Sequence, residues 1–217
     1  MDKKKTTIVV LFIISAIFLS LSLYSAYRFT HPPRKNPKEL PSDLNLSYQN
    51  LTFESGNKTL KGWFMPSSDK EANTTVLIVH GYGESKSSYL KVAKMLNSKY
   101  NIFAFDLRGH GESGGSTTTF GFKESKDIVE AVRAVKNITK GKIYGIGYSM
   151  GGSALAIAKN KSNSIDKIVI DSAFSDFNKA YLETAEDLPL LSYLREIIFP
   201  FLEGYIKTDP SHISPKR

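Results

Sequence analysis

Hydrophobic and polar residues follow several patterns along this chain, and the first is a long uncharged run. Thr6 to Tyr27 is rich in Ile, Val, Leu and Phe, and it follows the basic tip Met1 to Lys5. Its length matches the about 20 residues that a helix needs to cross a bilayer. We therefore expect a transmembrane anchor at residues 6–27, with the membrane as a partner.

A basic tip before an apolar core is also the signature of a cleaved secretory signal. The core is long for such a signal, and Tyr24-Ser25-Ala26 makes a poor cleavage site. We favour an uncleaved signal-anchor and a single-pass membrane protein. The lysines of residues 1–5 favour a cytoplasmic tip, with the bulk of the chain on the extracytoplasmic side, whereas Arg28, Arg34, Lys35 and Lys38 argue for the opposite orientation.

Residues 28–44 are expected to form a linker between the anchor and a folded domain at 45–217. Four prolines stand in the polar stretch from His31 to Pro41. Such a stretch sustains neither a helix nor a central strand. We expect a semi-stiff spacer that holds the domain away from the membrane.

The domain itself alternates between the patterns of strands and helices. Two strands, 48–53 and 60–65, flank a polar turn and predict a hairpin at a sheet edge. Further strands are expected at 76–80, 101–106, from Lys142 onward and at 168–171, with helices at 89–96, 124–135 and 153–158. Strands that alternate with helices predict an α/β fold with a doubly wound, mostly parallel sheet.

Composition narrows the classes of function. The net charge is +8, but the Lys and Arg residues are spread along the chain, which favours solubility or attraction to an anionic membrane surface over nucleic-acid binding. The absence of cysteine excludes disulfides, thiol catalysis and cysteine metal sites. We find no cluster with metal-ligand spacing and no nucleotide-binding fingerprint, so we expect no metal and no cofactor.

The candidate chemistry centres on Gly147-Tyr148-Ser149-Met150-Gly151, which fits the G-x-S-x-G nucleophile elbow. The serine stands on a strained turn between a strand and a helix, and the residues two before and two after crowd it. Only glycine leaves room at Gly147 and Gly151. The helix that follows directs its N-terminal N–H groups at any negative charge that develops beside the serine.

A second glycine-containing loop, His80-Gly81-Tyr82-Gly83, follows the first fully apolar strand. Acyl transfer to a serine needs hydrogen-bond donors for the oxyanion. The main-chain N–H groups of Tyr82 and Met150 are the candidate donors, and Gly81 permits a close approach. We expect His80 to fix this loop and not to transfer a proton.

A third loop runs from Asp106 to Gly115 after the next strand. We expect Asp106 and Arg108 to form an internal ion pair. Together with His110, they would shape the floor of the site without taking part in the chemistry.

These three loops follow successive strands, and together they resemble the α/β-hydrolase superfamily. The most similar members are membrane-anchored bacterial hydrolases of the monoacylglycerol lipase and serine aminopeptidase type. The resemblance covers about residues 51–214. It implies Ser149 as the nucleophile and the N–H groups of Tyr82 and Met150 as the oxyanion donors.

The C-terminal part departs from that superfamily, in which an acid and then a histidine follow later strands. The last two strands, the usual acid and the usual histidine are not recognisable after Asp171, while about 176–207 resembles a lid. We expect a C-terminally truncated form of the fold. A compact triad of Ser149 with Asp171 or Asp176 and His212 requires the tail to fold back; otherwise His212 is an exposed histidine.

The sequence thus predicts a membrane-anchored serine hydrolase, of the esterase, lipase or peptidase kind, that cleaves carboxylic esters or related small acyl compounds through a Ser149 acyl-enzyme. Two alternatives remain. The chain is a truncated, catalytically inactive hydrolase, or it is a membrane-tethered binding module that keeps the pocket without turnover.

Overall fold

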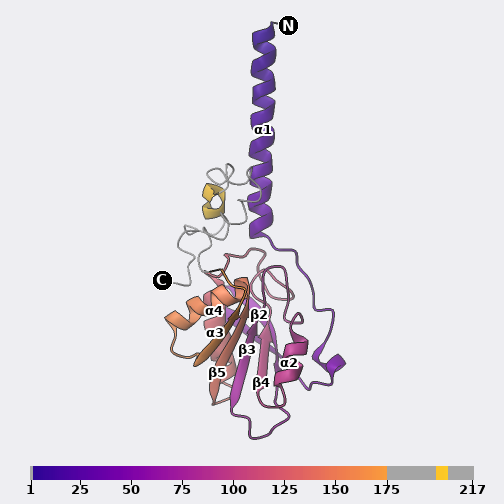
Figure 1. Ribbon diagram of the computed structural model, residues 1–217, viewed down its shortest axis with the longest axis vertical. Helices are drawn as coiled ribbons and strands as arrows, with labels where there is room; N and C mark the ends of the chain where they lie inside the picture. The colour runs from indigo at the N-terminus through magenta and orange to yellow at the C-terminus, as the bar shows by residue number, and fades with distance from the viewer. Residues whose placement is uncertain (1, 175–198, 205–217) are drawn as a thin grey trace.

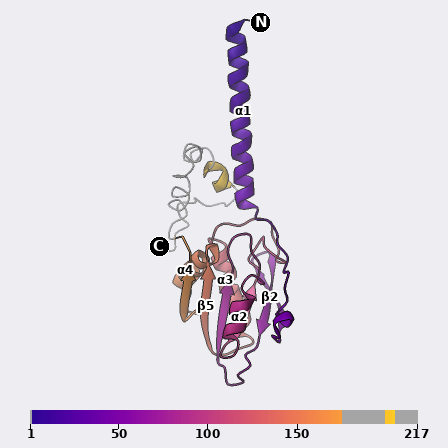
Figure 2. The same cartoon turned by 45° about the vertical axis from the view of Figure 1, so that its right-hand side comes forward.

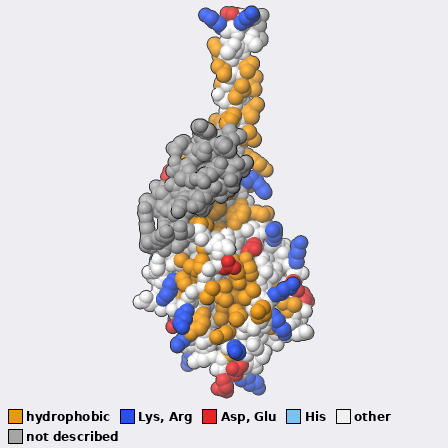
Figure 3. Space-filling view, viewed as in Figure 1, with side chains coloured by type: hydrophobic (Ala, Val, Ile, Leu, Met, Phe, Trp, Pro, Cys, Tyr) orange, Lys and Arg blue, Asp and Glu red, His pale blue; other side chains and the backbone are white. Residues whose placement is uncertain are grey.

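The computed structural model describes residues 2–174 and 199–204, and a single long helix dominates its shape (Figure 1). Helix α1 spans Lys3–Thr30 and stands out from the domain as a rod. Figure 3 shows hydrophobic side chains along this rod and charged ones at its tip. A helix that is apolar on all sides and exposed is suited to lipid, not to water. By length and composition α1 is able to cross a membrane.

The segment after α1 lies against the domain, so the expectation of a spacer that holds the domain off is wrong. The Arg34 guanidinium donates hydrogen bonds of 2.7 Å to the carbonyl oxygens of Gly111 and Ser113. A short 3-10 helix, η1 (Pro41–Leu44), follows, and Leu46 is buried beside α2. The prolines keep this segment irregular, as expected. However, the guanidinium of Arg34 carries several N–H donors, and these bind carbonyl groups of a loop in the domain.

The domain is built on a six-stranded sheet with the order β1-β2-β4-β3-β5-β6. Its strands are β1 (Gln49–Ser55), β2 (Lys58–Met65), β3 (Thr74–Val79), β4 (Asn101–Phe105), β5 (Lys142–Tyr148) and β6 (Lys167–Asp171). The hairpin β1–β2 forms the expected edge, and β2 pairs antiparallel with β4. The remaining pairs are parallel, which confirms the mostly parallel α/β sheet.

Three helices cover the two faces of this sheet (Figures 1 and 2). Helix α2 (Leu90–Leu96) packs on one face, in a cluster with Trp63, Val76 and Ile102. Helices α3 (Glu124–Lys136) and α4 (Met150–Lys161) contact each other on the opposite face. The apolar strands β3 and β4 are therefore buried between helices, as their unbroken hydrophobic runs predicted.

The order of the strands creates a topological switch point at the carboxyl edge of the sheet. Strands β3 and β5 are neighbours in the sheet, but the helices that follow them lie on opposite faces. Helix α2 follows β3 on one face, and α4 follows β5 on the other. Ligands of open α/β sheets bind at such a switch point, outside the carboxyl ends of the strands. The topology therefore places a site between the loops that follow Val79 and Tyr148.

Part of the region expected as a lid is described. Within residues 199–204, Leu202 is 1% exposed and belongs to the same cluster as Ala26 of α1. The other residues of the range 176–207 lie outside the described part of the chain. The end of α1 thus has apolar contact with the domain in addition to the contacts of the linker.

Candidate active site

Ser149 stands at the switch point of the sheet, at the junction of β5 and α4. Its backbone has φ 48° and ψ −121°, a conformation that non-glycine residues rarely adopt. Its N–H donates to the carbonyl oxygen of Asp171 at 2.9 Å, and its own carbonyl accepts the N–H of Gly152 at 2.9 Å. These bonds hold the strained turn, while the residue as a whole is exposed. The hydroxyl is thus available to a substrate.

The glycines around Ser149 are required for steric reasons, as the spacing predicted. A Cβ on Gly147 would lie 2.6 Å from the Cα of Gly152. A Cβ on Gly151 would lie 2.3 Å from the carbonyl oxygen of His80. Both contacts are with backbone, which cannot rotate away. The second contact also shows that the start of α4 touches the loop after β3.

The two residues whose main-chain N–H groups are the expected oxyanion donors lie close to this junction: Met150 follows Ser149, and Tyr82 follows Gly81. A Cβ on Gly81 would lie 3.3 Å from the Cβ of Ser149. Gly81 is therefore next to the serine, and Tyr82 is the residue that follows it. Within residues 2–174 and 199–204, the N–H groups of Tyr82 and Met150 have no hydrogen-bond acceptor. Unpaired donors beside an exposed hydroxyl are what acyl transfer requires of an oxyanion hole.

Glu84 fixes the loop close to the serine turn, a role that the sequence did not suggest: a Cβ on Gly81 would lie 3.1 Å from its Oε2 and 3.3 Å from the Cβ of Ser149. Its Oε2 accepts the N–H of Gly81 at 2.8 Å and the hydroxyl of Tyr89 at 3.0 Å. The ring of Tyr89 stacks on that of Tyr148, with 3.6 Å between centroids. The only sequence signal was an acidic residue three positions after Gly81, which is common in turns and not specific.

His80 lies buried beneath the serine turn, 1% exposed. Its Nε2 accepts the N–H of Leu107 at 3.0 Å, so the proton is on Nδ1, which donates to the carbonyl oxygen of Gly81 at 2.8 Å. Burial lowers the pKa of His80 and keeps the ring neutral. Because both ring nitrogens are bonded, His80 ties two loops together.

The expected ion pair between Asp106 and Arg108 is wrong, because each side chain pairs with another residue. Asp106 is fully buried and binds the Nζ of Lys86 at 2.6 Å and the N–H of Glu112 at 2.9 Å. The Nε of Arg108 donates to Asp127 of α3 at 2.7 Å. The chain turns after β4, so residues two positions apart reach different elements.

His110 is also buried in the floor of the site. Its Nδ1 lies 2.8 Å from the carbonyl oxygen of Arg108, and its ring meets those of His80 and Tyr82 edge-on. Its Nε2 has no hydrogen-bond partner in the described part of the chain. Burial lowers the pKa of His110 to about 4. The ring is therefore a neutral packing element at pH 7.

The structure brings one candidate acid next to Ser149 and leaves the other candidates outside the described residues. Asp171 ends β6, and its carbonyl oxygen accepts the N–H of Ser149. Its side chain is exposed and accepts the hydroxyl of Ser172 at 2.8 Å. Asp176 and His212 lie outside the described residues, so the structure does not place them.

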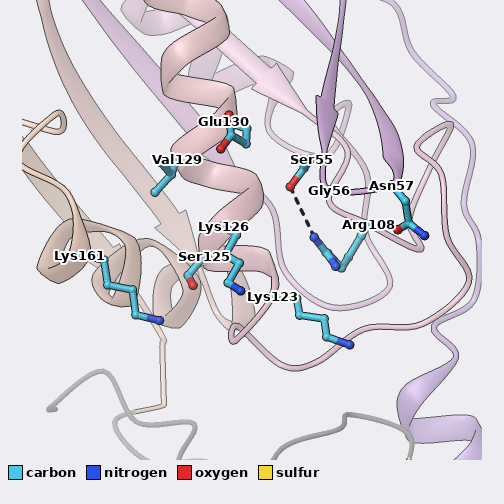
Figure 4. Close-up of a pocket in the computed structure, with 10 residues that line it drawn as sticks. All are labelled: Ser55, Gly56, Asn57, Arg108, Lys123, Ser125, Lys126, Val129, Glu130 and Lys161. Atoms are coloured by element: carbon cyan, nitrogen blue, oxygen red, sulfur yellow. Dashed lines mark hydrogen bonds between the residues drawn. The ribbon is translucent and has the colours of Figure 1, made fainter.

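A separate cavity of about 480 Å³ opens between the β1–β2 turn and α3 (Figure 4). Lys123, Lys126 and Lys161 line it, together with Arg108, which reaches the hydroxyl of Ser55. Among the described residues, those that line this cavity include no histidine. In the described part of the chain, no group of His, Asp and Glu side chains could hold a metal ion.

Comparison with protein families gives one match that covers more than half of the chain. The family described as "alpha/beta hydrolase fold" matches residues 74–195. This range includes the loop after β3, the loop after β4 and the turn that carries Ser149.

Curated relatives are similar over part of their length. An uncharacterized protein of Salmonella typhi, YfhR, is 27% identical over 186 residues, which are 78% of this chain and 62% of the relative. An uncharacterized protein of Bacillus subtilis, YqkD, is 33% identical over 134 residues, 58% of this chain and 43% of the relative. The chain thus spans about half the length of the curated relatives that it matches.

Among solved structures, an esterase of Pyrococcus furiosus is similar with a TM-score of 0.69 and 30% sequence identity. The match covers 86% of this chain and 72% of the esterase. The esterase is thus similar to this chain in both sequence and fold, and this similarity agrees with the family match.

Proposed function

The chain belongs to the α/β-hydrolase fold family, and on this premise we propose that it is a serine hydrolase that cleaves carboxylic esters or related acyl compounds. One observation carries the proposal. Ser149 is exposed on a strained turn, at the switch point of the sheet, beside two N–H groups that have no acceptor in the described residues. The esterase from Pyrococcus furiosus supports an ester as the substrate.

The reaction begins when the Ser149 hydroxyl attacks the carbonyl carbon of the substrate. The new C–O bond moves an electron pair onto the carbonyl oxygen, where the N–H groups of Tyr82 and Met150 stabilise the negative charge. The N-terminus of α4 adds a positive partial charge at the same place. Collapse of this intermediate expels the alcohol and leaves an acyl-serine, which water then hydrolyses to the acid.

A base must take the proton of Ser149 and return it to the leaving alcohol. We propose His212 for this role, since it is the only histidine that follows Ser149 in the sequence. Asp171 is the proposed acid that orients the imidazole, because its main chain is bonded to Ser149. His80 and His110 are poor candidates because they are buried and have lowered pKa values.

Reaction with a fluorophosphonate probe, followed by intact-mass analysis, tests these roles. We expect one adduct on the full chain in detergent, and none on Ser149→Ala or His212→Ala. Ser116→Ala removes another exposed hydroxyl and should keep the adduct. No adduct on folded protein would overturn the proposal, and an adduct that survives His212→Ala would refute His212 as the base.

We also propose that α1 anchors the chain in a membrane, with the domain on the extracytoplasmic side. The chain contains no cysteine, so single cysteines can be introduced as reporters. A membrane-impermeant maleimide added to intact cells should label Lys70→Cys in the domain but not Lys4→Cys in the tip. The reverse pattern would show the opposite orientation.

A further inference from the structure

The end of α1 is joined directly to the candidate active site. The hydroxyl of Tyr82 donates a hydrogen bond of 2.8 Å to the carbonyl oxygen of Arg28. Two residues later, the carbonyl oxygen of Thr30 accepts the N–H of Thr118 at 2.8 Å. Figures 1 and 2 show the end of α1 above the loops at this edge of the sheet. Tyr82 also carries one of the two proposed oxyanion donors.

With α1 as the proposed membrane anchor, the same end of the helix would lie at the surface of the bilayer. The uncharged run ends at Tyr27, and Arg28 is the first charged residue after Lys5. At 1.5 Å per residue, about 20 residues cross a hydrocarbon layer of about 30 Å. With Thr6 to Tyr27 in that layer, Arg28 lies at the level of the lipid headgroups. Tyr82, bonded to Arg28, lies at that level as well.

Aromatic side chains fill the space between the helix end and the site. The ring of Tyr82 stacks on Phe120, with 5.8 Å between centroids and 7° between planes. Phe120 in turn contacts Phe29 of α1, at 6.4 Å between centroids. A row of contacting rings therefore links the end of α1 to Tyr82, the residue after Gly81.

We propose that this site takes its substrate from the bilayer, as an acyl ester whose chain stays embedded in the leaflet at the end of α1. Each methylene that leaves a bilayer for water costs free energy, so a site far from the surface would have to extract the whole chain. Here the ester group, which lies near the headgroups, reaches Ser149 with little withdrawal. The proposal names the substrate class of the proposed hydrolase and rests on that function.

The experiment uses the full chain in phosphatidylcholine vesicles and two esters of the same fluorogenic alcohol. The butyrate ester is offered in water, and the palmitate ester is embedded in the vesicles. One variant carries a polar helical spacer of eleven residues between Tyr27 and Arg28, which raises the domain by about 16 Å and keeps the helical phase. The control carries the same spacer between Lys5 and Thr6.

We expect butyrate hydrolysis within twofold of wild type in both variants, which shows that the site is intact. Palmitate hydrolysis should fall at least tenfold in the variant with the spacer after Tyr27, and stay within twofold in the control. Equal palmitate activity in both variants would overturn the proposal, and so would a parallel loss of both activities in the first variant. If wild type hydrolyses neither ester, the proposed hydrolase function itself fails.

Discussion

The carboxylate of Glu84 accepts the main-chain N–H of Gly81 in a hydrogen bond of 2.8 Å. Gly81 precedes Tyr82, whose own N–H has no acceptor among the described residues and is a proposed oxyanion donor. A carboxylate is a strong acceptor for a peptide N–H, so this bond fixes the direction of the loop. Because an oxyanion hole depends on donors that are held in place before the reaction, Glu84 is a positioning residue for the proposed chemistry.

Replacing Glu84 should therefore lower kcat strongly and change KM little. For Glu84→Ala we expect a fall in kcat of about 10-fold to 100-fold, less than the loss of a whole oxyanion donor, with KM nearly unchanged. Glu84→Gln keeps an acceptor for Gly81 and should restore most of kcat. Steady-state kinetics on a soluble ester measures both, with the exposed Glu71→Ala as the control. An unchanged kcat in Glu84→Ala would refute the positioning role.

The contact between Gly151 and the carbonyl oxygen of His80 predicts that the serine turn does not tolerate a methyl group. A Cβ at Gly151 would lie 2.3 Å from that oxygen, and backbone must move to relieve the clash. We expect Gly151→Ala to lose about 3 kcal/mol of the free energy of unfolding, and with it the probe adduct. Chemical denaturation in detergent measures the loss.

Gly204→Ala is the matched control for this substitution, since a Cβ there meets nothing within 4 Å. It should change the free energy of unfolding by less than about 1 kcal/mol. Equal stability of the two variants would show that the elbow relaxes more easily than its geometry implies.

The ion pair between Arg108 and Asp127 predicts a large cost when one partner is removed. Asp127 is buried, and burial raises the pKa of its carboxyl although Arg108 opposes this effect. Arg108→Met leaves that charge without its cation and should cost about 3–5 kcal/mol of the free energy of unfolding. Adding Asp127→Leu to the same chain should recover part of the loss.

The exposed pair of Arg133 and Glu130 provides the comparison on the same helix. Arg133→Met should cost no more than about 0.5 kcal/mol, because solvent screens an exposed pair. Urea unfolding of the three variants beside wild type measures these differences. A small loss in Arg108→Met would mean that water reaches Asp127 when the arginine is gone.

The fold could be predicted from the sequence because its signals are local. Unbroken apolar runs predict β3 and β4, and the helical spacing of apolar residues around Ile128 predicts α3. The glycines around Ser149 predict the turn between β5 and α4. Each signal depends on residues within one or two turns of the chain. Together they also fixed the position of the serine at the carboxyl edge of the sheet.

Partners that are distant in the sequence could not be predicted in this way. Asp106 binds Lys86, and Arg34 binds carbonyl groups of the loop at 111–115. Charged residues are frequent in this chain, so neither composition nor spacing distinguishes the true partner of Asp106 from Arg108. The expectation of a free spacer at residues 28–44 fails for the same reason, because the attachment of this segment depends on Arg34 and on a loop far along the chain.

The burial of His110 predicts that the folded chain loses stability in mild acid. Burial lowers its pKa from 6.5 to about 4, so between these values the unfolded chain binds a proton that the folded chain does not. Stability therefore rises with pH across this window, and it falls as pH drops from 6.5 toward 4, by up to about 3 kcal/mol. Burial lowers the pKa of His80 too, so its effect has the same sign. We expect the urea midpoint of wild type to fall between pH 7 and pH 4.5, and that of His110→Gln to fall less. Parallel slopes in the two proteins would show that other groups, such as His80, cause the acid sensitivity.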